Sequence, residues 1–381
     1  MSGLLPFPIE FLFFGLTLLG IALFHHQTLW IALGGMLIIV AYKLLFTDFD
    51  LVHHLAHEHN TLLNLLGLLT GFSLLAAHFE HSKLPLLLPD ILPDDWKGGF
   101  VLIVLTAILS SFLDNIAAAM ITGAIAMIVF QNRLHIGFLA AIVAASNAGG
   151  SGSVVGDTTT TMMWIEGVPA SHVVKAFVGA LPAVLICGYF GAKQQDKFQR
   201  ILKDAPGDIK INYRKLLVVA MILAGAILTN VFFELPALGV WIAIGLGALI
   251  TDTPWKELPP ALKGSAFLLA LVFSASMMPV DSLPPASWES AFSLGFISAV
   301  FDNIPLTKLA LEQGGYDWGI LAFTVGFGGS MIWFGSSAGV ALTTRFPEGR
   351  SVVQWLKHGW HVIVAYVISF FIMLALTGWK P

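Results

Sequence analysis

Residues 146–161 read Ser146-Asn-Ala-Gly-Gly-Ser-Gly-Ser-Val-Val-Gly-Asp-Thr-Thr-Thr-Thr161, a polar, glycine-rich run between two apolar segments. Without this run, its flanks Ile136 to Ala145 and Met162 to Trp164 would read as one membrane helix. In hydrocarbon, a non-helical break is tolerated only where it is buried in protein or lines a wet cavity. The run is therefore a candidate binding site, and its apolar flanks disfavour a phosphate-type loop of a soluble protein. Its glycines favour unwound backbone, with Asp157 and Thr158 at the start of the helix that resumes.

The composition is that of a membrane protein. Of the 381 residues, 57% are hydrophobic and 11% are charged, whereas soluble domains contain about 25% charged residues. We therefore expect an all-α polytopic membrane protein in contact with lipid. The net charge of -4 suggests no nucleic-acid partner, and a single cysteine, Cys187, excludes an intrachain disulfide. The segment Phe7 to Phe24 lacks the features of a cleaved signal and is expected to be the first retained helix.

The first half contains segments of two different lengths. Ordinary membrane helices are predicted near residues 8–24, 29–46, 60–77 and 172–192. Phe100 to Leu113, in contrast, has only 14 apolar residues before Asp114-Asn115, and a second short run, Ile116 to Phe130, follows. At 1.5 Å per residue such a helix covers about 21 Å, which is too short for a hydrocarbon core of roughly 30 Å. Residues 99–130 are therefore predicted to form a re-entrant hairpin, followed by a broken helix over 136–165.

The second half repeats this order. Helices are expected near 213–229, 236–251, 262–280 and 358–378, with a hairpin over 287–312 and a broken helix over 317–345. Residues 111–116 align with 299–304 at an offset of 188, and residues 149–151 align with 328–330 at an offset of 179. Chance similarity between apolar segments is the alternative, but the polar tips, glycine pairs and segment order all agree. The chain is therefore predicted to contain two repeats, 1–192 and 213–381, joined by a linker over 193–215.

The basic residues indicate how the repeats are oriented. If each hairpin re-enters, each half crosses the membrane five times, and the second half is inverted relative to the first. The linker then lies in the cytoplasm by the positive-inside rule, and 15 of the 19 Lys and Arg residues fall in cytoplasmic loops. If each hairpin instead crossed the membrane once, Lys83 and Lys97 would lie on the outer side, which fits the positive-inside rule less well. Inverted repeats with broken helices are typical of secondary transporters, whose sites lie near the midplane. No GxxxxGK[ST] phosphate-binding motif supports ATP-driven transport.

Four polar elements are expected to converge at that site. The first hairpin tip and break contribute Ser110, Ser111, Asp114, Asn115, Asn147, Ser151, Asp157 and Thr158, and the second pair contributes Ser298, Asp302, Asn303, Thr307, Ser330, Ser336 and Ser337. Intramembrane carboxylates require a cation, a proton or a basic partner. Carboxylate, amide, hydroxyl and carbonyl oxygens suit a small hard cation, and three carboxylates would repel an anionic substrate. The sequence therefore favours a cation such as Na⁺, bound at Asp114, Asp157 and Asp302.

The roles of individual charged residues remain open at this level. Burial disfavours the ionised form of a carboxylate, so an aspartate at the site could exchange a proton for the cation. Alternatively, Asp114, Asp157 and Asp302 cap the helices that follow them. Lys308, in the second hairpin, is either a built-in counter-ion or a residue that snorkels to the surface.

The motifs also resemble a known family. Phe112-Leu-Asp-Asn115, Asn147-Ala-Gly-Gly150, Gly156-Asp-Thr-Thr-Thr-Thr-Met-Met-Trp164 and Ser298-Ala-Val-Phe-Asp-Asn-Ile-Pro-Leu-Thr307 are similar to those of NhaD-type sodium/proton antiporters. These antiporters are part of the ion transporter superfamily, which also includes citrate, dicarboxylate and arsenite carriers. The resemblance implies a homodimer in the inner (plasma) membrane that works by an elevator-like movement, with Na⁺ and H⁺ transported and no cofactor. The chain departs from the family pattern at Gly152-Ser-Val-Val155 and Lys308, and it is shorter than expected.

A histidine cluster and two rival functions complete the predictions. His53, His54, His57 and His59 fall outside in this topology. They either form a solvated loop, or His53 and His57 share a helix face and bind a metal or sense the external pH. A sodium-coupled symporter of citrate or a related carboxylate is the alternative to the antiporter. An intramembrane enzyme is disfavoured, because the sequence has no HExxH or GxSxG motif.

Overall fold

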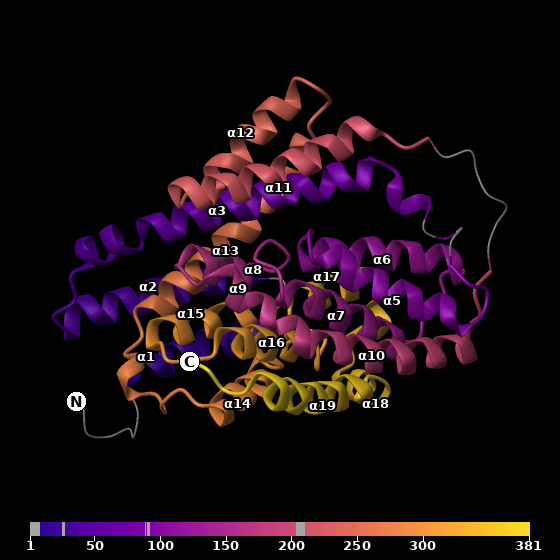
Figure 1. The fold of residues 1–381 in the computed structure, drawn as a ribbon. Helices are drawn as coiled ribbons and strands as arrows, with labels where there is room; N and C mark the ends of the chain where they lie inside the picture. The colour runs from indigo at the N-terminus through magenta and orange to yellow at the C-terminus, as the bar shows by residue number, and fades with distance from the viewer. Residues whose placement is uncertain (1–7, 25–26, 88, 90–91, 203–209) are drawn as a thin grey trace.

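A computed structural model gives the structure of the protein and describes residues 8–24, 27–87, 89, 92–202 and 210–381. The regular elements in these ranges are all helical (Figure 1). Six of the helices are long and apolar enough to cross a membrane, which confirms the prediction of a multi-pass membrane protein. The helices form two groups, which we call the flanking group and the central group.

The flanking group contains the longest helix, α3 (Leu51–His81). It consists of α1 (Ile9–Leu23), α2 (Thr28–Phe46), α3, α11 (Tyr213–Phe233), α12 (Pro236–Ala248) and α13 (Leu258–Ser276). Helices α3, α11 and α12 pack side by side at the top of Figure 1, and α13 packs on both α2 and α3. The indole nitrogen of Trp241 donates to the carbonyl of Gly67 at 3.0 Å, where α12 crosses α3 closely. Large apolar side chains such as Phe232 and Leu249 remain exposed on this group, as expected for a lipid-facing surface.

The central group contains the short and broken helices. It consists of α5 (Trp96–Ser110), α6 (Asn115–Val129), α7 (Ile136–Ser151), α8 (Thr158–Ile165), α9 (Ala170–Val173), α10 (Phe177–Phe198), α14 (Trp288–Ser298), α15 (Asn303–Gln313), α16 (Trp318–Gly328), α17 (Ser337–Arg345), α18 (Val352–His358) and α19 (Trp360–Thr377). Helices α7 and α16 pack together at its centre, and both are buried over almost their whole length. Helices α10 and α19 cover them from one side. The interrupted segments therefore form the core of the molecule.

Two helix pairs have the hairpin form expected from the sequence. Helices α5 and α6 have 15 residues each and join through a turn ending at Asp114, while α14 and α15 have 11 residues each and join through a turn ending at Asp302. In the first pair, the hydroxyl of Thr106 donates to that of Thr122 at 2.9 Å. Re-entry into the membrane, the inverted orientation and the repeat boundaries stay predictions.

Some predicted boundaries need correction. Helix α3 begins at Leu51 rather than near residue 60, capped by Asp50, whose carboxylate accepts from Val52 and His53 amides. The histidine cluster therefore lies in the first turns of a helix, and its interpretation as a loop was wrong. At the other end of the first repeat, α10 continues to Phe198, inside the predicted linker. Lys203, one of the basic residues attributed to that linker, lies outside the described residues.

Candidate functional site

Each of the three candidate aspartates caps the helix that follows it. Asp114 accepts a hydrogen bond from the Ile116 amide at 2.8 Å, and Asp302 accepts one from the Ile304 amide at 3.0 Å. Asp157 accepts one from the Thr159 amide at 3.3 Å. In each case a single oxygen, Oδ1, serves as the cap, so the second oxygen is left for another partner. Capping and cation binding are therefore compatible roles for these side chains.

Asp157 is the most deeply buried of the three aspartates. Its side chain is 2% exposed, and its Oδ2 has no hydrogen-bond partner within the described ranges. This oxygen faces Gly326 of α16, where a Cβ atom would lie 3.4 Å from it. A buried carboxylate oxygen without a donor is costly unless a cation or a proton neutralises it. The absence of a side chain at Gly326 leaves room at this point for the first broken helix.

A chain of amide groups joins the first hairpin to both broken helices. The Nδ2 of Asn115 donates to Oδ1 of Asn147 at 3.0 Å and reaches Oδ1 of Asp157 at 3.4 Å. The Nδ2 of Asn147 then donates to the hydroxyl of Ser330 at 2.9 Å, although the two residues are 183 positions apart. All four side chains are buried. The predicted convergence of these residues from the two halves is thus present in the structure.

Hydroxyl groups hold the hairpin tips against the breaks. Ser110 donates to the Ser146 carbonyl at 2.6 Å, and Ser298 donates to the Val325 carbonyl at 2.7 Å. The two donor residues, Ser110 and Ser298, are 188 positions apart in the sequence, which is the offset that aligns the hairpins. The two acceptor residues, Ser146 and Val325, are 179 positions apart, which is the offset that aligns the breaks. Two close backbone contacts follow the same offsets: Gly149 packs against Ala107, and Gly328 packs against Gly295. In both contacts the backbones are too close for a Cβ atom on Gly149 or Gly328. Equivalent positions in the two halves therefore make equivalent contacts.

Some backbone carbonyls of the first break accept hydrogen bonds from side chains of the same segment. The hydroxyl of Thr160 donates to the Ser153 carbonyl at 2.6 Å, and that of Thr161 donates to the Val154 carbonyl at 2.9 Å. Ser153 in turn donates to the Ser111 carbonyl at 2.6 Å. These bonds satisfy backbone groups that the unwound segment would otherwise leave unpaired. They also tie the loop to the start of α8 and to the first hairpin tip.

The aspartates line two separate cavities. Asp114, Asp157, Thr158 and Thr161 face a cavity of about 10 Å³, closed by apolar residues of α3. That volume is close to the space needed for one water molecule. Asp302 and Ser337, whose hydroxyl donates to Oδ2 of Asp302 at 3.3 Å, line a cavity of about 220 Å³ beside α1 and α13. The three carboxylates therefore do not surround a single point. Consistent with this separation, no group of three or more His, Cys, Asp or Glu side chains in the described part of the chain is arranged to hold a metal ion.

Three further predicted site residues are buried near the tips and breaks and bond within their own elements. Thr307 donates to the Asn303 carbonyl at 3.0 Å, and Ser151 donates to the Ala148 carbonyl at 2.8 Å. Ser336 caps α17 by accepting from the Gly339 amide at 3.3 Å, at the position equivalent to Asp157 in the first half. The second broken helix thus uses a neutral cap where the first uses a carboxylate.

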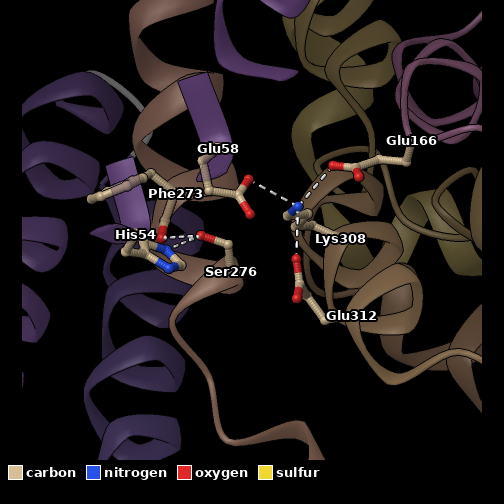
Figure 2. Close-up of polar contacts among 7 residues, drawn as sticks. All are labelled: His54, Glu58, Glu166, Phe273, Ser276, Lys308 and Glu312. Atoms are coloured by element: carbon tan, nitrogen blue, oxygen red, sulfur yellow. Dashed lines mark hydrogen bonds and ion pairs between the residues drawn. The ribbon is translucent and has the colours of Figure 1, made fainter. Parts of the chain in front are cut away.

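Lys308 has partners that the sequence interpretation missed. It does not snorkel, because its side chain is 1% exposed, and its ion pairs are with three glutamates rather than with the aspartates. Its Nζ lies 3.0 Å from Glu58, 2.8 Å from Glu166 and 2.7 Å from Glu312. Figure 2 shows the three glutamates around the ammonium group. The i, i+4 spacing of Lys308 and Glu312 was the one sequence signal for this cluster.

The four histidines differ in how far they pack into the protein. His54 lies 2.9 Å from the Ser276 hydroxyl of α13, whereas His53, His57 and His59 are exposed. The Nδ1 of His59 lies 2.7 Å from the Ala56 carbonyl of its own helix. The i, i+4 pair His53 and His57 therefore remains a feature of the exposed helix face.

Comparison with known proteins gives several relatives, although no family model matches the chain. It is 29% identical over 349 residues to sodium/proton antiporter 1 of Arabidopsis thaliana, covering 77% of this chain and 58% of that relative. It is 25% identical over 375 residues to sodium/proton antiporter 2 of the same plant, covering 84% and 85%. It is 25% identical over 342 residues to the Na(+)/H(+) antiporter NhaD of Alkalimonas amylolytica, covering 74% and 69%. The resemblance to NhaD-type antiporters is confirmed, although the chain spans less than two thirds of the first plant relative.

Proposed function

We propose that this chain is a sodium/proton antiporter that exchanges Na⁺ for H⁺ at buried aspartates. The observation that carries the proposal is the buried Oδ2 of Asp157, which has no hydrogen-bond partner in the part of the chain that the structure describes. Its side chain shares a cavity of about 10 Å³ with Asp114. Both carboxylates need a neutralising charge at this depth. A small cation or a proton fits the cavity. The names of the relatives support the same activity, since they are antiporters of these two ions.

Exchange follows when the two ions compete for the same oxygens. A dehydrated Na⁺ ion prefers hard oxygen ligands, which the carboxylates of Asp114 and Asp157 and the hydroxyls of Thr158 and Thr161 provide. Protonation neutralises a carboxylate and converts one of its oxygens from an acceptor to a donor, so sodium loses its ligand. A site that is neutralised in turn by each ion moves one ion in each direction when it alternately faces the two sides. Asp302, in its separate cavity, is then a second titratable position.

We further propose that the central group moves against the flanking group in an elevator-like manner. The two groups meet mainly where α15 packs on α13 and where α8 packs on α3. The candidate site belongs chiefly to the central group, whereas α3 contributes only apolar residues to the smaller cavity. A rigid displacement would therefore carry the site with it. A homodimer held by the flanking group and an inner-membrane location complete this proposal, as the resemblance implies.

The alternative is a sodium-coupled carrier of citrate or a related carboxylate. The cavity beside Asp114 and Asp157 is too small for such a substrate. Among the described residues, the lining of the larger cavity beside Asp302 is mainly apolar and includes no Lys, Arg or His. Such a lining offers a trivalent anion no charge partner, so the antiporter explains the described site better.

Transport in proteoliposomes tests the proposal directly. A sodium gradient with no organic anion present should drive protons in the opposite direction, which a pH-sensitive dye inside the vesicles would record. Asp157→Asn should abolish this signal, because Asn keeps the capping oxygen and removes the titratable group. Asp95→Asn is the matched control, since Asp95 also caps a helix through the Lys97 amide but is exposed. Proton movement that requires added citrate would instead support the symporter.

A further inference from the structure

A second buried charge cluster lies between the two helix groups, away from the aspartates. Lys308 and Glu312 come from α15, Glu166 follows α8, and Glu58 comes from α3 of the flanking group (Figure 2). The Lys308 and Glu58 side chains are 1% and 3% exposed, whereas those of Glu166 and Glu312 are 26% and 29% exposed. The only charge pair of this cluster that joins the flanking group to the central group is therefore also its most buried one.

The charges in this cluster do not balance. One ammonium group contacts three carboxylates, so full ionisation would leave two uncompensated negative charges in a largely buried place. Glu166 and Glu312 are partly hydrated and take the two shorter contacts with Nζ. Carboxylates that share one site cannot all ionise readily, because each raises the cost of charging the others. One carboxylate of the cluster is therefore expected to carry a proton under conditions in which an isolated glutamate would not.

Glu58 is the member of the cluster that best fits this role. Its buried Oε2 lies 3.0 Å from Nζ of Lys308, the longest of the three contacts, and has no other polar partner among the described residues. Two polar groups beside the cluster, His54 one turn earlier on α3 and Ser276 of α13, contact each other at 2.9 Å. Lys43 of α2 lies beyond them and donates to the Met277 carbonyl at 2.7 Å. His57, also on α3, is exposed. No second fixed cation in the described structure contacts Glu58.

We propose that Glu58 reversibly binds a proton at this site, separately from the ion exchange at the aspartates, and that the bound proton opens the Lys308–Glu58 ion pair. A neutral Glu58 leaves Lys308 paired with Glu312 and Glu166, both of the central group. The charge contact between α3 and α15 is then lost, while the contacts inside the central group persist. Proton binding at this position thus controls how firmly the two groups are held together. This role of Glu58 goes beyond the proposed function, and it would hold even if the chain did not transport sodium.

Infrared difference spectroscopy of the purified full-length chain tests the proposal without any transport measurement. A pH titration in sodium-free buffer should show a carboxylic acid C=O band that disappears as the pH rises. This band should be missing in Glu58→Gln. It should persist in Glu80→Gln, which removes an exposed glutamate from the same helix α3, and in Asp114→Asn and Asp302→Asn. A band that is unchanged in Glu58→Gln would overturn the proposal.

Charge variants around an intact Glu58 give an independent measurement, which stays decisive if Glu58→Gln does not fold. Glu312→Gln removes one repelling charge, so the band should disappear at a pH lower by about one unit or more, as expected for one nearby charge. Lys308→Met removes the attracting charge, so the band should persist to higher pH. A titration midpoint that neither substitution moves would show that the protonated group is elsewhere. A midpoint that shifts with added sodium in Asp114→Asn would identify the cluster as a sodium site instead of a proton site.

Discussion

At the scale of single residues, Asp114 and Asp302 each act as a helix cap and are proposed to act as ion ligands. We predict that Asp114→Asn and Asp302→Asn each abolish sodium/proton exchange while the protein remains folded. The reason is that an Asn oxygen accepts the same amide hydrogen bond from Ile116 or Ile304, but the side chain cannot exchange a proton. Dye-reported proton movement in proteoliposomes measures the first effect, and thermal unfolding in detergent measures the second. Full exchange by both single variants would contradict the assignment of these two carboxylates.

Asn147 connects the two halves through single hydrogen bonds, and its loss should affect both stability and exchange. Asn147→Ala leaves the buried Asn115 and Ser330 side chains without their shared partner. The expected cost is about 1–3 kcal/mol for each unsatisfied group, together with loss of sodium-dependent proton movement. Thermal unfolding and the proteoliposome assay would measure the two effects.

Asn64→Ala is the matched control for this change. Asn64 is a buried amide on α3 that accepts from the Ala237 amide at 3.4 Å inside the flanking group. The substitution should destabilise the protein, but the molecules that remain folded should still exchange sodium for protons. Equal loss of exchange in both variants would mean that Asn147 acts only through stability.

At the scale of elements, the short hairpins predict where their ends are accessible. Helices of 15 and 11 residues are shorter than the roughly 20 needed to span the bilayer, so both ends of a hairpin should lie on one side. We predict that cysteines at Lys97 and Arg133 label from the cytoplasm and that cysteines at Ala286 and Gln313 label from outside. Membrane-impermeant thiol reagents on sealed vesicles of known orientation make the measurement.

The structure determines the choice of these labelling positions. Gly98 is buried against the Pro93 carbonyl, and Gly314 has φ of +70°, so a cysteine would distort either one. Arg133 and Lys97 are exposed at the two ends of the first pair. Cys187, which is fully buried, is replaced by alanine in the background. Labelling from opposite sides within one pair would show a full crossing and would remove the argument for inverted repeats.

At the scale of the whole molecule, Lys308 links both helix groups by a buried charge. We predict that Lys308→Ala destabilises the protein by about 3–5 kcal/mol, because removing this partner leaves the buried charge of Glu58 unpaired. The loss should be largest at alkaline pH, where the three glutamates are ionised, and should shrink as the pH falls and they become neutral. Thermal unfolding in detergent at several pH values would measure this dependence.

Lys97→Ala provides the control for removing a lysine. Lys97 forms an exposed pair with Asp95 at 3.9 Å, and such surface pairs contribute about 0–1 kcal/mol. The stability of the Lys97→Ala protein should therefore differ little from that of the unmodified protein at any pH. If Lys308→Ala behaved in the same way, the buried cluster would not hold the two groups together.

The sequence alone determined the class of the protein and the location of its unusual elements. Composition identified a helical membrane protein, because the cost of burying backbone and charge in lipid leaves few other solutions. The hairpin tips at Asp114 and Asp302 and the first break were predictable from local patterns, since helix length and glycine content are properties of neighbouring residues. The similarity to NhaD-type antiporters was likewise contained in contiguous motifs.

Only the tertiary structure decided which of the polar residues meet. It pairs Asn147 with Ser330, separates Asp302 from Asp157 into another cavity, and surrounds Lys308 with glutamates from three elements. These outcomes depend on how helices far apart in the chain pack and on the rotation of each about its axis. Local periodicity shows that a face is buried, but it does not show which residue of a distant helix lies opposite. For that reason the sequence located the candidate site, whereas the partner of each charge in it emerged only from the packing.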